Sequence, residues 1–317
     1  SMFVYNAICV MSDQLTSKAG TITSGEDRFM EWKTKDGNYE NTQYAQFDTF
    51  FEGMFDRARL PDIIKNFICF SDEGLKKYKI LAGYHQYFAV RKAVEQAKIA
   101  TATDGKGGVF WHTQGSGKSL TMVMLAKYIL MELASCNPRV VIVTDRKELD
   151  GQIANTFSHT RLNPARATSG RHLVELVKDG KADVITTIIN KFNTAERLDT
   201  KNYSKNVFVL IDESHRSNYG SMASKMRTVF PNACYIGFTG TPLMKREKNT
   251  LARFGKLIHK YTIRDGVEDG AIVPLIYEGR FVEQKVDEEN IDMWFKQTTK
   301  RLTDPQKEDL RQKWSSI

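Results

Sequence analysis

Short apolar runs that alternate with helical stretches constrain the fold of this chain more than any other feature. Each run is nearly all apolar, which is typical of parallel strands buried on both faces of a sheet. Helices between such strands connect them into a parallel sheet. The predicted strands are 108–112, 139–144, 183–188, 207–211 and 234–239, and the predicted helices are 84–97, 118–133, 147–157, 171–178 and 221–229. The pattern predicts an α/β fold with a doubly wound parallel sheet.

A glycine-rich segment, His112-Thr-Gln-Gly-Ser-Gly-Lys-Ser119, lies between the first predicted strand and the helix that follows it. Its glycines allow backbone N–H groups to close around a phosphate, and the amino end of a helix favours negative charge. Lys118 can reach the terminal phosphates of ATP, and the Ser119 hydroxyl can bind Mg²⁺. His112 replaces the first glycine of the usual GxxxxGK[ST] pattern, and a glycine-rich turn that caps a buried helix is the alternative. The predicted nucleotide-binding residues of this segment are Gln114, Gly115, Ser116, Gly117, Lys118 and Ser119.

A pair of carboxylates, Asp212 and Glu213, follows the predicted strand 207–211. At the end of a strand, Asp212 would lie near a magnesium ion bound to phosphate oxygens, and Glu213 could orient or deprotonate the attacking water. Such a pair by itself is usually an acidic loop. Its position two strand–helix units beyond the phosphate loop favours nucleotide hydrolysis, with Lys118, Asp212 and Glu213 as the catalytic candidates.

Together these motifs resemble those of superfamily 2 helicases and translocases, which share a RecA-like first lobe. The resemblance rests on the phosphate loop, on Asp212-Glu-Ser-His215 and on Thr239-Gly-Thr-Pro242. For two of the implied sites an ordinary alternative exists, a surface glutamine at 86 and a helix cap near 145–148. The resemblance implies Gln86 for adenine, Arg146 and Gln152 for the DNA backbone, and His215, Thr239 and Thr241 for coupling hydrolysis to lobe movement.

A closer resemblance, over almost the whole chain, is to the restriction (R) subunits of type I restriction enzymes. It rests on Phe110-Trp-His-Thr-Gln-Gly-Ser-Gly-Lys-Ser, on Asp212-Glu-Ser-His-Arg-Ser and on flanks such as Phe29-Met-Glu-Trp-Lys-Thr-Lys-Asp-Gly. It implies an ATP- and Mg²⁺-dependent translocase on duplex DNA, with methylation and specificity subunits as partners. The alternatives are another superfamily 2 helicase, a type III restriction subunit, or a nucleotide- and DNA-binding module without turnover.

The same resemblance divides the chain into parts and sets expectations for its ends. It implies the end of a nuclease domain at 1–60, a linker at 61–82, a first motor domain at 83–245 and a connection towards a second motor domain at 246–317. Glu31-Trp-Lys33 matches the ExK of nuclease sites, but no strand pattern presents it, so we expect the nuclease acids elsewhere. No stretch after 242 resembles the arginine-finger motif, which is typically worth about 10³–10⁵ in rate, so we expect weak hydrolysis from this chain alone.

The net charge of +8 is concentrated in residues 83–245, which hold 22 basic and 13 acidic side chains. This excess would suit a polyanion such as DNA, although a solvated basic surface is the alternative. No apolar stretch approaches the roughly 20 residues of a membrane span. Four cysteines far apart in the sequence suggest neither a zinc site nor a disulfide framework and fit a reducing, cytoplasmic location: Cys9, Cys69, Cys136 and Cys234.

Overall fold

A computed structural model describes most of the chain and divides it into two compact units, residues 1–274 and residues 275–317. The described residues are 5–38, 47–73, 76–145, 147–160, 162–180, 182–198, 201–212, 219–240, 248–274, 278, 288–300 and 302–314.

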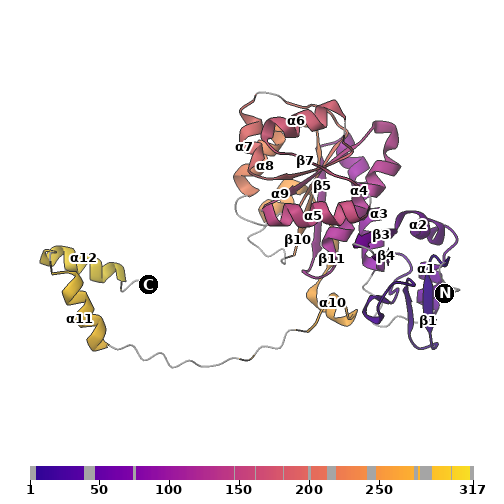
Figure 1. Cartoon of the computed structure of the whole chain (residues 1–317), viewed down its shortest axis with the longest axis horizontal. Helices are drawn as coiled ribbons and strands as arrows, with labels where there is room; N and C mark the ends of the chain where they lie inside the picture. Colours follow the sequence, from indigo (N-terminus) through magenta and orange to yellow (C-terminus); the bar gives the residue numbers. More distant parts are fainter. Residues whose placement is uncertain are drawn as a thin grey trace. The chain divides into compact units, whose positions relative to one another are not determined.

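A seven-stranded sheet forms the centre of the first unit (Figure 1). Its strand order is β11-β5-β10-β9-β6-β8-β7, and every neighbouring pair is parallel. The carboxyl ends of the strands therefore meet at one edge of the sheet, where open α/β sheets bind their ligands. The strands are β5 (Lys106–His112), β6 (Arg139–Thr144), β7 (Ala165–Arg166), β8 (Val184–Ile188), β9 (Val207–Ile211), β10 (Cys234–Thr239) and β11 (Leu257–Tyr261).

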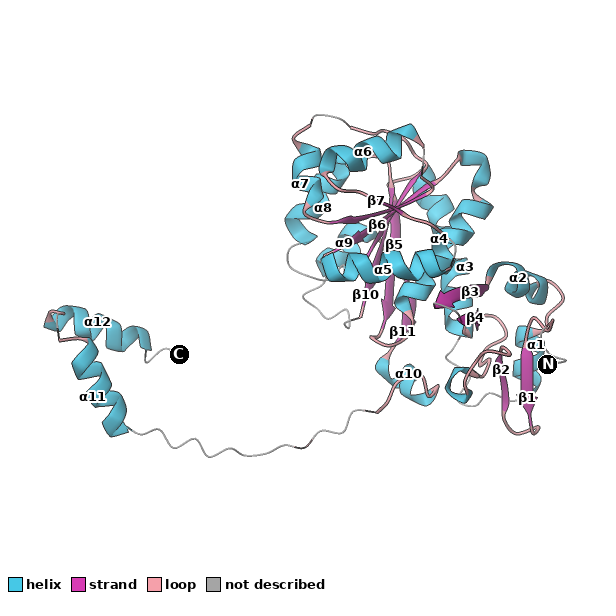
Figure 2. Ribbon diagram, in the orientation of Figure 1, coloured by secondary structure: helices cyan, strands magenta, loops and turns pink. Residues whose placement is uncertain are grey.

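Helices cover both faces of this sheet, as Figure 2 shows. Neighbouring residues of one strand belong to different hydrophobic clusters, since side chains alternate along a strand: Phe110 joins one cluster and Val109 the other. The first cluster includes residues of α3 (Tyr84–Ala102), α4 (Lys118–Glu132) and α5 (Lys147–His159). The second includes residues of α6 (Gly170–Asp179), α7 (Lys191–Glu196), α8 (Tyr219–Val229) and α9 (Lys248–Phe254). The predicted doubly wound α/β sheet is thus confirmed.

The segments before α3 pack against that helix and share its core. Trp32 is only 3% exposed, and its ring lies 5.6 Å from the Tyr87 ring and 5.9 Å from the Phe88 ring. Because both partners belong to α3, the N-terminal part of the first unit is joined to the sheet layer by aromatic packing. Its elements are β1 (Cys9–Ser12), β2 (Ser17–Gly20), η1 (Glu26–Arg28), α1 (Phe47–Met54), α2 (Arg59–Asn66), β3 (Ile68–Glu73) and β4 (Lys76–Leu81).

The second unit contains α11 (Glu288–Thr298) and α12 (Asp304–Trp314). Within it, Phe295 is buried, and the Thr299 hydroxyl donates to the Phe295 carbonyl at 2.6 Å. None of the described helices, in either unit, has the length and apolar character that a membrane crossing requires.

The predicted elements of the sheet match the observed ones to within two residues at each end, except that the predicted helix 84–97 extends to Ala102. β7, β11, α7 and α9 were not predicted. The apolar run Val4–Met11 also predicts a strand. Of its described residues only 9–11 belong to one, because the ladder of β1 with the four residues of β2 begins at Cys9. The apolar run Leu275–Val282 predicts a further strand, which lies almost entirely outside the described residues.

Candidate nucleotide-binding site

The phosphate loop connects the end of β5 to the start of α4, as the sequence predicted. Gly115 and Gly117 have φ values of +85° and +78°, a region that favours glycine because other residues pay a steric cost there. Both glycines are exposed. The buried Ser116 hydroxyl donates to the Thr113 carbonyl at 2.7 Å, which closes the turn from inside. The loop thus presents its backbone to solvent at the amino end of α4, the place where a helix favours an anion.

Lys118 lies against the end of the neighbouring strand β10. A side chain at Gly240 would meet the Lys118 ammonium, because a Cβ built there lies 2.7 Å from Nζ. Because Gly240 has no side chain, the Lys118 ammonium can occupy this space. Since β10 pairs with β5 in parallel, this contact joins the phosphate loop to Gly240, the residue after β10.

Asp212 reaches the same edge of the sheet, directly after β9. Its N–H donates to the Val143 carbonyl of β6 at 3.0 Å, and the residue is only 8% exposed. In the register, Gly237 of β10 lies between Ile211 of β9 and Val109 of β5. Strands about 4.8 Å apart place β9 about 10 Å from β5, with β10 between them, so Asp212 and the phosphate loop follow strands that lie close together at the same edge of the sheet.

Gln86 is buried against the phosphate loop. Its amide nitrogen donates to the Gly117 carbonyl and to the Thr121 hydroxyl, both at 3.3 Å, and its amide oxygen accepts the Gly83 N–H at 3.0 Å. The alternative of a surface glutamine is wrong, since the residue is 5% exposed. The proposed role of Gln86 in binding adenine stays a prediction. To bind adenine, the amide would have to give up these hydrogen bonds and form new ones to the base.

His85, the residue before Gln86, was not predicted as part of the site. Its Nε2 lies 3.3 Å from the Ser116 carbonyl, and because a carbonyl only accepts, Nε2 must carry the proton. Burial lowers the pKa of His85 to about 4, although Asp269 and Asp265 act in the opposite direction. The ring is therefore a neutral donor to the loop at neutral pH.

A buried pair of histidines, His112 and His259, supports the base of the loop. Nε2 of His112 and Nδ1 of His259 are 2.9 Å apart, so one ring donates to the other. Burial, followed by the neighbouring His259, His85 and Lys118, lowers the pKa of His112 well below its usual value, and burial also lowers the pKa of His259. The side chain that replaces the first glycine of the usual pattern is thus a neutral, fully buried part of the core.

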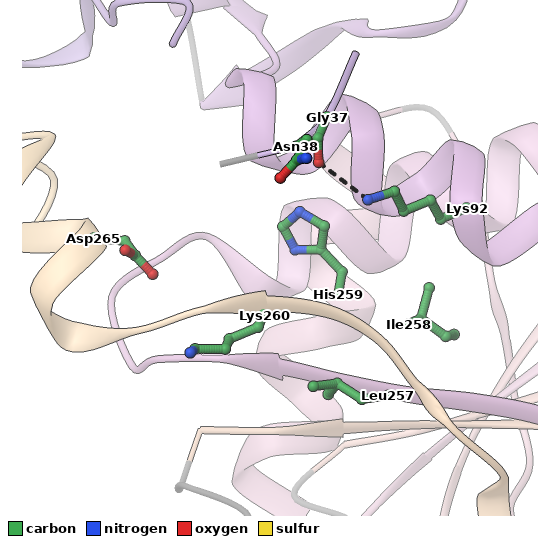
Figure 3. Close-up of a pocket in the computed structure, with 8 residues that line it drawn as sticks. All are labelled: Gly37, Asn38, Lys92, Leu257, Ile258, His259, Lys260 and Asp265. Atoms are coloured by element: carbon green, nitrogen blue, oxygen red, sulfur yellow. Dashed lines mark hydrogen bonds between the residues drawn. The ribbon is translucent and has the colours of Figure 1, made fainter. Parts of the chain in front are cut away.

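His259 also borders a polar cavity of about 440 Å³ (Figure 3). There the Lys92 ammonium donates to the Gly37 carbonyl at 3.1 Å, and the Lys260 ammonium lies 5.5 Å from the Trp111 ring centre. The cavity is thus one hydrogen bond removed from His112 and the phosphate loop. Its lining residues are Gly37, Asn38, Lys92, Leu257, Ile258, His259, Lys260 and Asp265.

A buried carboxylate, Asp269, joins three separate segments behind His85. It accepts hydrogen bonds from the hydroxyls of Tyr84 (2.8 Å) and Tyr261 (2.7 Å), and an ion pair joins it to the Lys33 ammonium at 2.5 Å. Its side chain is 4% exposed and that of Lys33 is 14% exposed. Lys33 of the ExK tripeptide is thus bound to a carboxylate of a distant segment. No local pattern in the sequence marks these contacts.

The remaining predicted site residues divide into those within the described part of the chain and those outside it. Arg146, Glu213, His215 and Thr241 lie outside the described residues, and Gln152 lies on α5 with its side chain outside them. Thr239 is fully buried at the end of β10 and pairs with Trp111 of β5.

Comparison with known proteins adds the family. The SWI2/SNF2 ATPase family matches residues 85–308. This chain therefore belongs to the SWI2/SNF2 ATPase family. The HindI type I restriction enzyme endonuclease subunit of Haemophilus influenzae is 35% identical over 87% of this chain and 29% of its own length. A Methanocaldococcus jannaschii relative, named for the same kind of subunit, is 33% identical over all of this chain and 32% of its own length.

The resemblance to type I R subunits, predicted from the motifs, is confirmed by these relatives. The chain spans about a third of their length. Among solved structures, the Sulfolobus solfataricus SWI2/SNF2 ATPase core in complex with double-stranded DNA is similar with a TM-score of 0.39 and 18% identity, over 55% of this chain and 36% of that one.

Proposed function

We propose that this chain is the ATP-binding motor part of a type I restriction enzyme R subunit and acts as an ATP- and Mg²⁺-dependent translocase on duplex DNA. The observation that carries this proposal is the convergence of three features at one edge of the sheet. They are a loop with two left-handed glycines, the Lys118 ammonium beside Gly240, and the Asp212 carboxylate after β9. Such an edge suits a nucleoside triphosphate with its metal ion.

Each residue would act on the nucleotide in a different way. Lys118 would balance the charge of the terminal phosphates, and the N–H groups at the start of α4 would donate to the phosphate oxygens. Ser119 and Asp212 supply hydroxyl and carboxylate oxygens, the donors that Mg²⁺ prefers. A bound Mg²⁺ would neutralise charge that develops on the phosphates. Glu213 is the proposed base that orients the attacking water.

DNA would lie against the basic middle of the chain. Residues 83–245 carry the cationic excess, and Arg146 and Gln152 are the proposed backbone contacts. His215, Thr239 and Thr241 are proposed to couple hydrolysis to lobe movement. In this proposal residues 1–60 end a nuclease domain, 61–82 form a linker, 83–245 form the first motor domain and 246–317 lead towards a second. Methylation and specificity subunits are the proposed partners.

Calorimetry on the 317-residue chain with Lys118→Ala tests this assignment. We expect the dissociation constant for ATP·Mg²⁺ to rise about 10- to 100-fold and that for AMP to change little, since a hydrogen bond to a charged group is worth about 1.5–3 kcal/mol. Lys127→Ala is a matched control on the same helix, because the Lys127 ammonium contacts only the Lys65 carbonyl among the bonds described here.

Two measurements could contradict the proposal. Equal losses for ATP and AMP would place Lys118 away from the terminal phosphates. Phosphate release from the full-length subunit, with and without duplex DNA, separates an enzyme from a binding module. Release that duplex DNA does not stimulate, or that Lys118→Ala leaves intact, would contradict a DNA-driven motor.

A further inference from the structure

The first turn of α3 lies against the outer side of the phosphate loop and contacts two consecutive carbonyls. His85 Nε2 lies 3.3 Å from the Ser116 oxygen, and Gln86 Nε2 lies 3.3 Å from the Gly117 oxygen. The approach is close, because a Cβ on Gly117 would lie only 2.9 Å from Gln86 Nε2. Adjacent residues of one helix thus hold adjacent peptide units of the loop.

These contacts decide where the N–H groups of the loop point. In a planar trans peptide, the C=O and N–H bonds point in opposite directions. When the Ser116 carbonyl is drawn towards α3, the N–H of Gly117 therefore points to the other side of the loop. The Gly117 carbonyl, which also accepts the Thr121 N–H of α4 at 3.0 Å, directs the N–H of Lys118 in the same way. Both N–H groups belong to the set that would donate to a phosphate.

The His85 ring is itself fixed from behind. It is 2% exposed and stacks on the Tyr261 ring at 4.0 Å, with an angle of 15° between the planes. The Tyr261 hydroxyl donates to Asp269, which also holds Lys33. We call His85, Tyr261, Asp269 and Lys33 the buried support. Since its charges are paired and its imidazole is neutral, the support orients the loop without adding a cation beside Lys118.

We propose that His85 is a positioning residue of the phosphate loop: its Nε2–H holds the Ser116 carbonyl so that the N–H group of Gly117 faces a bound polyphosphate. This inference rests on the proposed function, because it assumes that the loop binds a nucleotide. It goes beyond that function because it assigns the conformation of the loop in part to a residue of another element, His85 of α3. A histidine that only filled core space would act on stability and not on ligand choice.

Three substitutions at position 85 in the 317-residue chain separate these roles. His85→Leu removes the donor, His85→Asn shortens its reach, and His85→Gln places an amide N–H at the distance of Nε2. ADP·Mg²⁺, ATP·Mg²⁺ and AMP are titrated by calorimetry, and folding is checked by thermal unfolding. His172→Leu is the control, since His172 lies on α6 and bonds only to Thr168 and Ser169 among the described contacts.

We expect His85→Leu and His85→Asn to weaken ADP and ATP about tenfold, the scale of one backbone hydrogen bond, and AMP much less. His85→Gln should recover affinity to within about threefold of the parent. A folded His85→Leu that binds ATP like the parent would overturn the inference, and so would equal losses for AMP and ATP. If His85→Leu does not fold, equal affinities of His85→Gln and His85→Asn would overturn it. A parent chain that binds neither ADP nor ATP would instead contradict the proposed function, and the inference with it.

Discussion

The phosphate loop and the buried support behind it differ in where their residues come from. The loop is eight consecutive residues, from His112 to Ser119. The support is assembled from an N-terminal segment, the start of α3, the edge strand β11 and the residue after α10 (Ile263–Glu268). A search for local motifs finds the first region and misses the second, because hydrogen bonds between distant segments leave no spacing pattern.

The two regions also differ in exposure and charge. Gly115 and Gly117 are exposed, and Lys118 is half-buried at their side. Asp269 is 4% exposed and offsets the charge of Lys33. A change in the loop should therefore alter ligand affinity with little effect on folding. Among the residues of the support, His85 makes the described hydrogen bond to the loop, so a change at Asp269 should instead lower stability with little effect on affinity.

The largest expected effect is on folding, from Asp269→Asn. The substitution leaves the Lys33 ammonium, 14% exposed, without its counter-charge. Breaking a buried pair costs about 3 kcal/mol of unfolding free energy, whereas ATP affinity should stay within about threefold. Urea unfolding measures the first and calorimetry the second.

The matched control for this substitution is an exposed ion pair. Lys35 pairs with Glu52, and their side chains are 49% and 61% exposed. Glu52→Gln should change the unfolding free energy by less than about 1 kcal/mol, as exposed pairs contribute little. An Asp269→Asn loss as small as that of Glu52→Gln would show that the buried support does not hold the three segments together.

An intermediate effect is expected from acid. The folded pKa of His85 is about 4, below its ordinary value of 6.5, so the unfolded chain binds more protons between these limits. The stability from this group is fully present above pH 6.5 and is lost as the pH falls towards 4. By linkage His85 alone accounts for about 2 kcal/mol of the loss between pH 7 and pH 5.

Comparing the parent with His85→Gln isolates this contribution, since glutamine does not titrate. Unfolding free energies at pH 7 and pH 5 should differ by about 2 kcal/mol less in the variant. The other buried histidines, His112 and His259, add a loss of the same sign to both proteins. Identical pH dependence of the two proteins would mean that His85 is charged, or exposed, in solution.

The sequence predicted the central strands because their environment is simple. Every residue of β6 and of β9 is buried, and an apolar run, 140–143 in β6 and 207–211 in β9, identifies each strand. β11 was missed because this edge strand mixes exposed and buried residues in Leu-Ile-His-Lys-Tyr. β7 has only two residues, too few for any period. Apolar patterns therefore identify the centre of the sheet better than its edges.

The site shows the same limit. Lys118 and Asp212 were predicted from a motif and from a carboxylate after a strand, and the structure brings both to one edge of the sheet. That His112 would be fully buried against His259 could not be predicted, since the two are 147 residues apart. Contacts of that kind follow from the packing of α3 and β11 on β5, which only the folded chain supplies.

The smallest expected effect comes from one methyl group at the loop. Gly240→Ala would place a Cβ 2.7 Å from the Lys118 Nζ, and the neighbour that must move is the flexible end of a side chain. The unfolding free energy should therefore change by less than about 1 kcal/mol, since no backbone has to shift. ATP·Mg²⁺ affinity should fall about tenfold, because the ammonium is displaced from the terminal phosphates, and AMP affinity should be retained. Gly151→Ala on α5 is the control, as nothing lies within 4 Å of a Cβ there. Unchanged ATP affinity of Gly240→Ala would show that ATP binding does not require the Lys118 ammonium to lie beside β10. The binding geometry of the loop would then depend less on the neighbouring segments than the contacts of the buried support suggest.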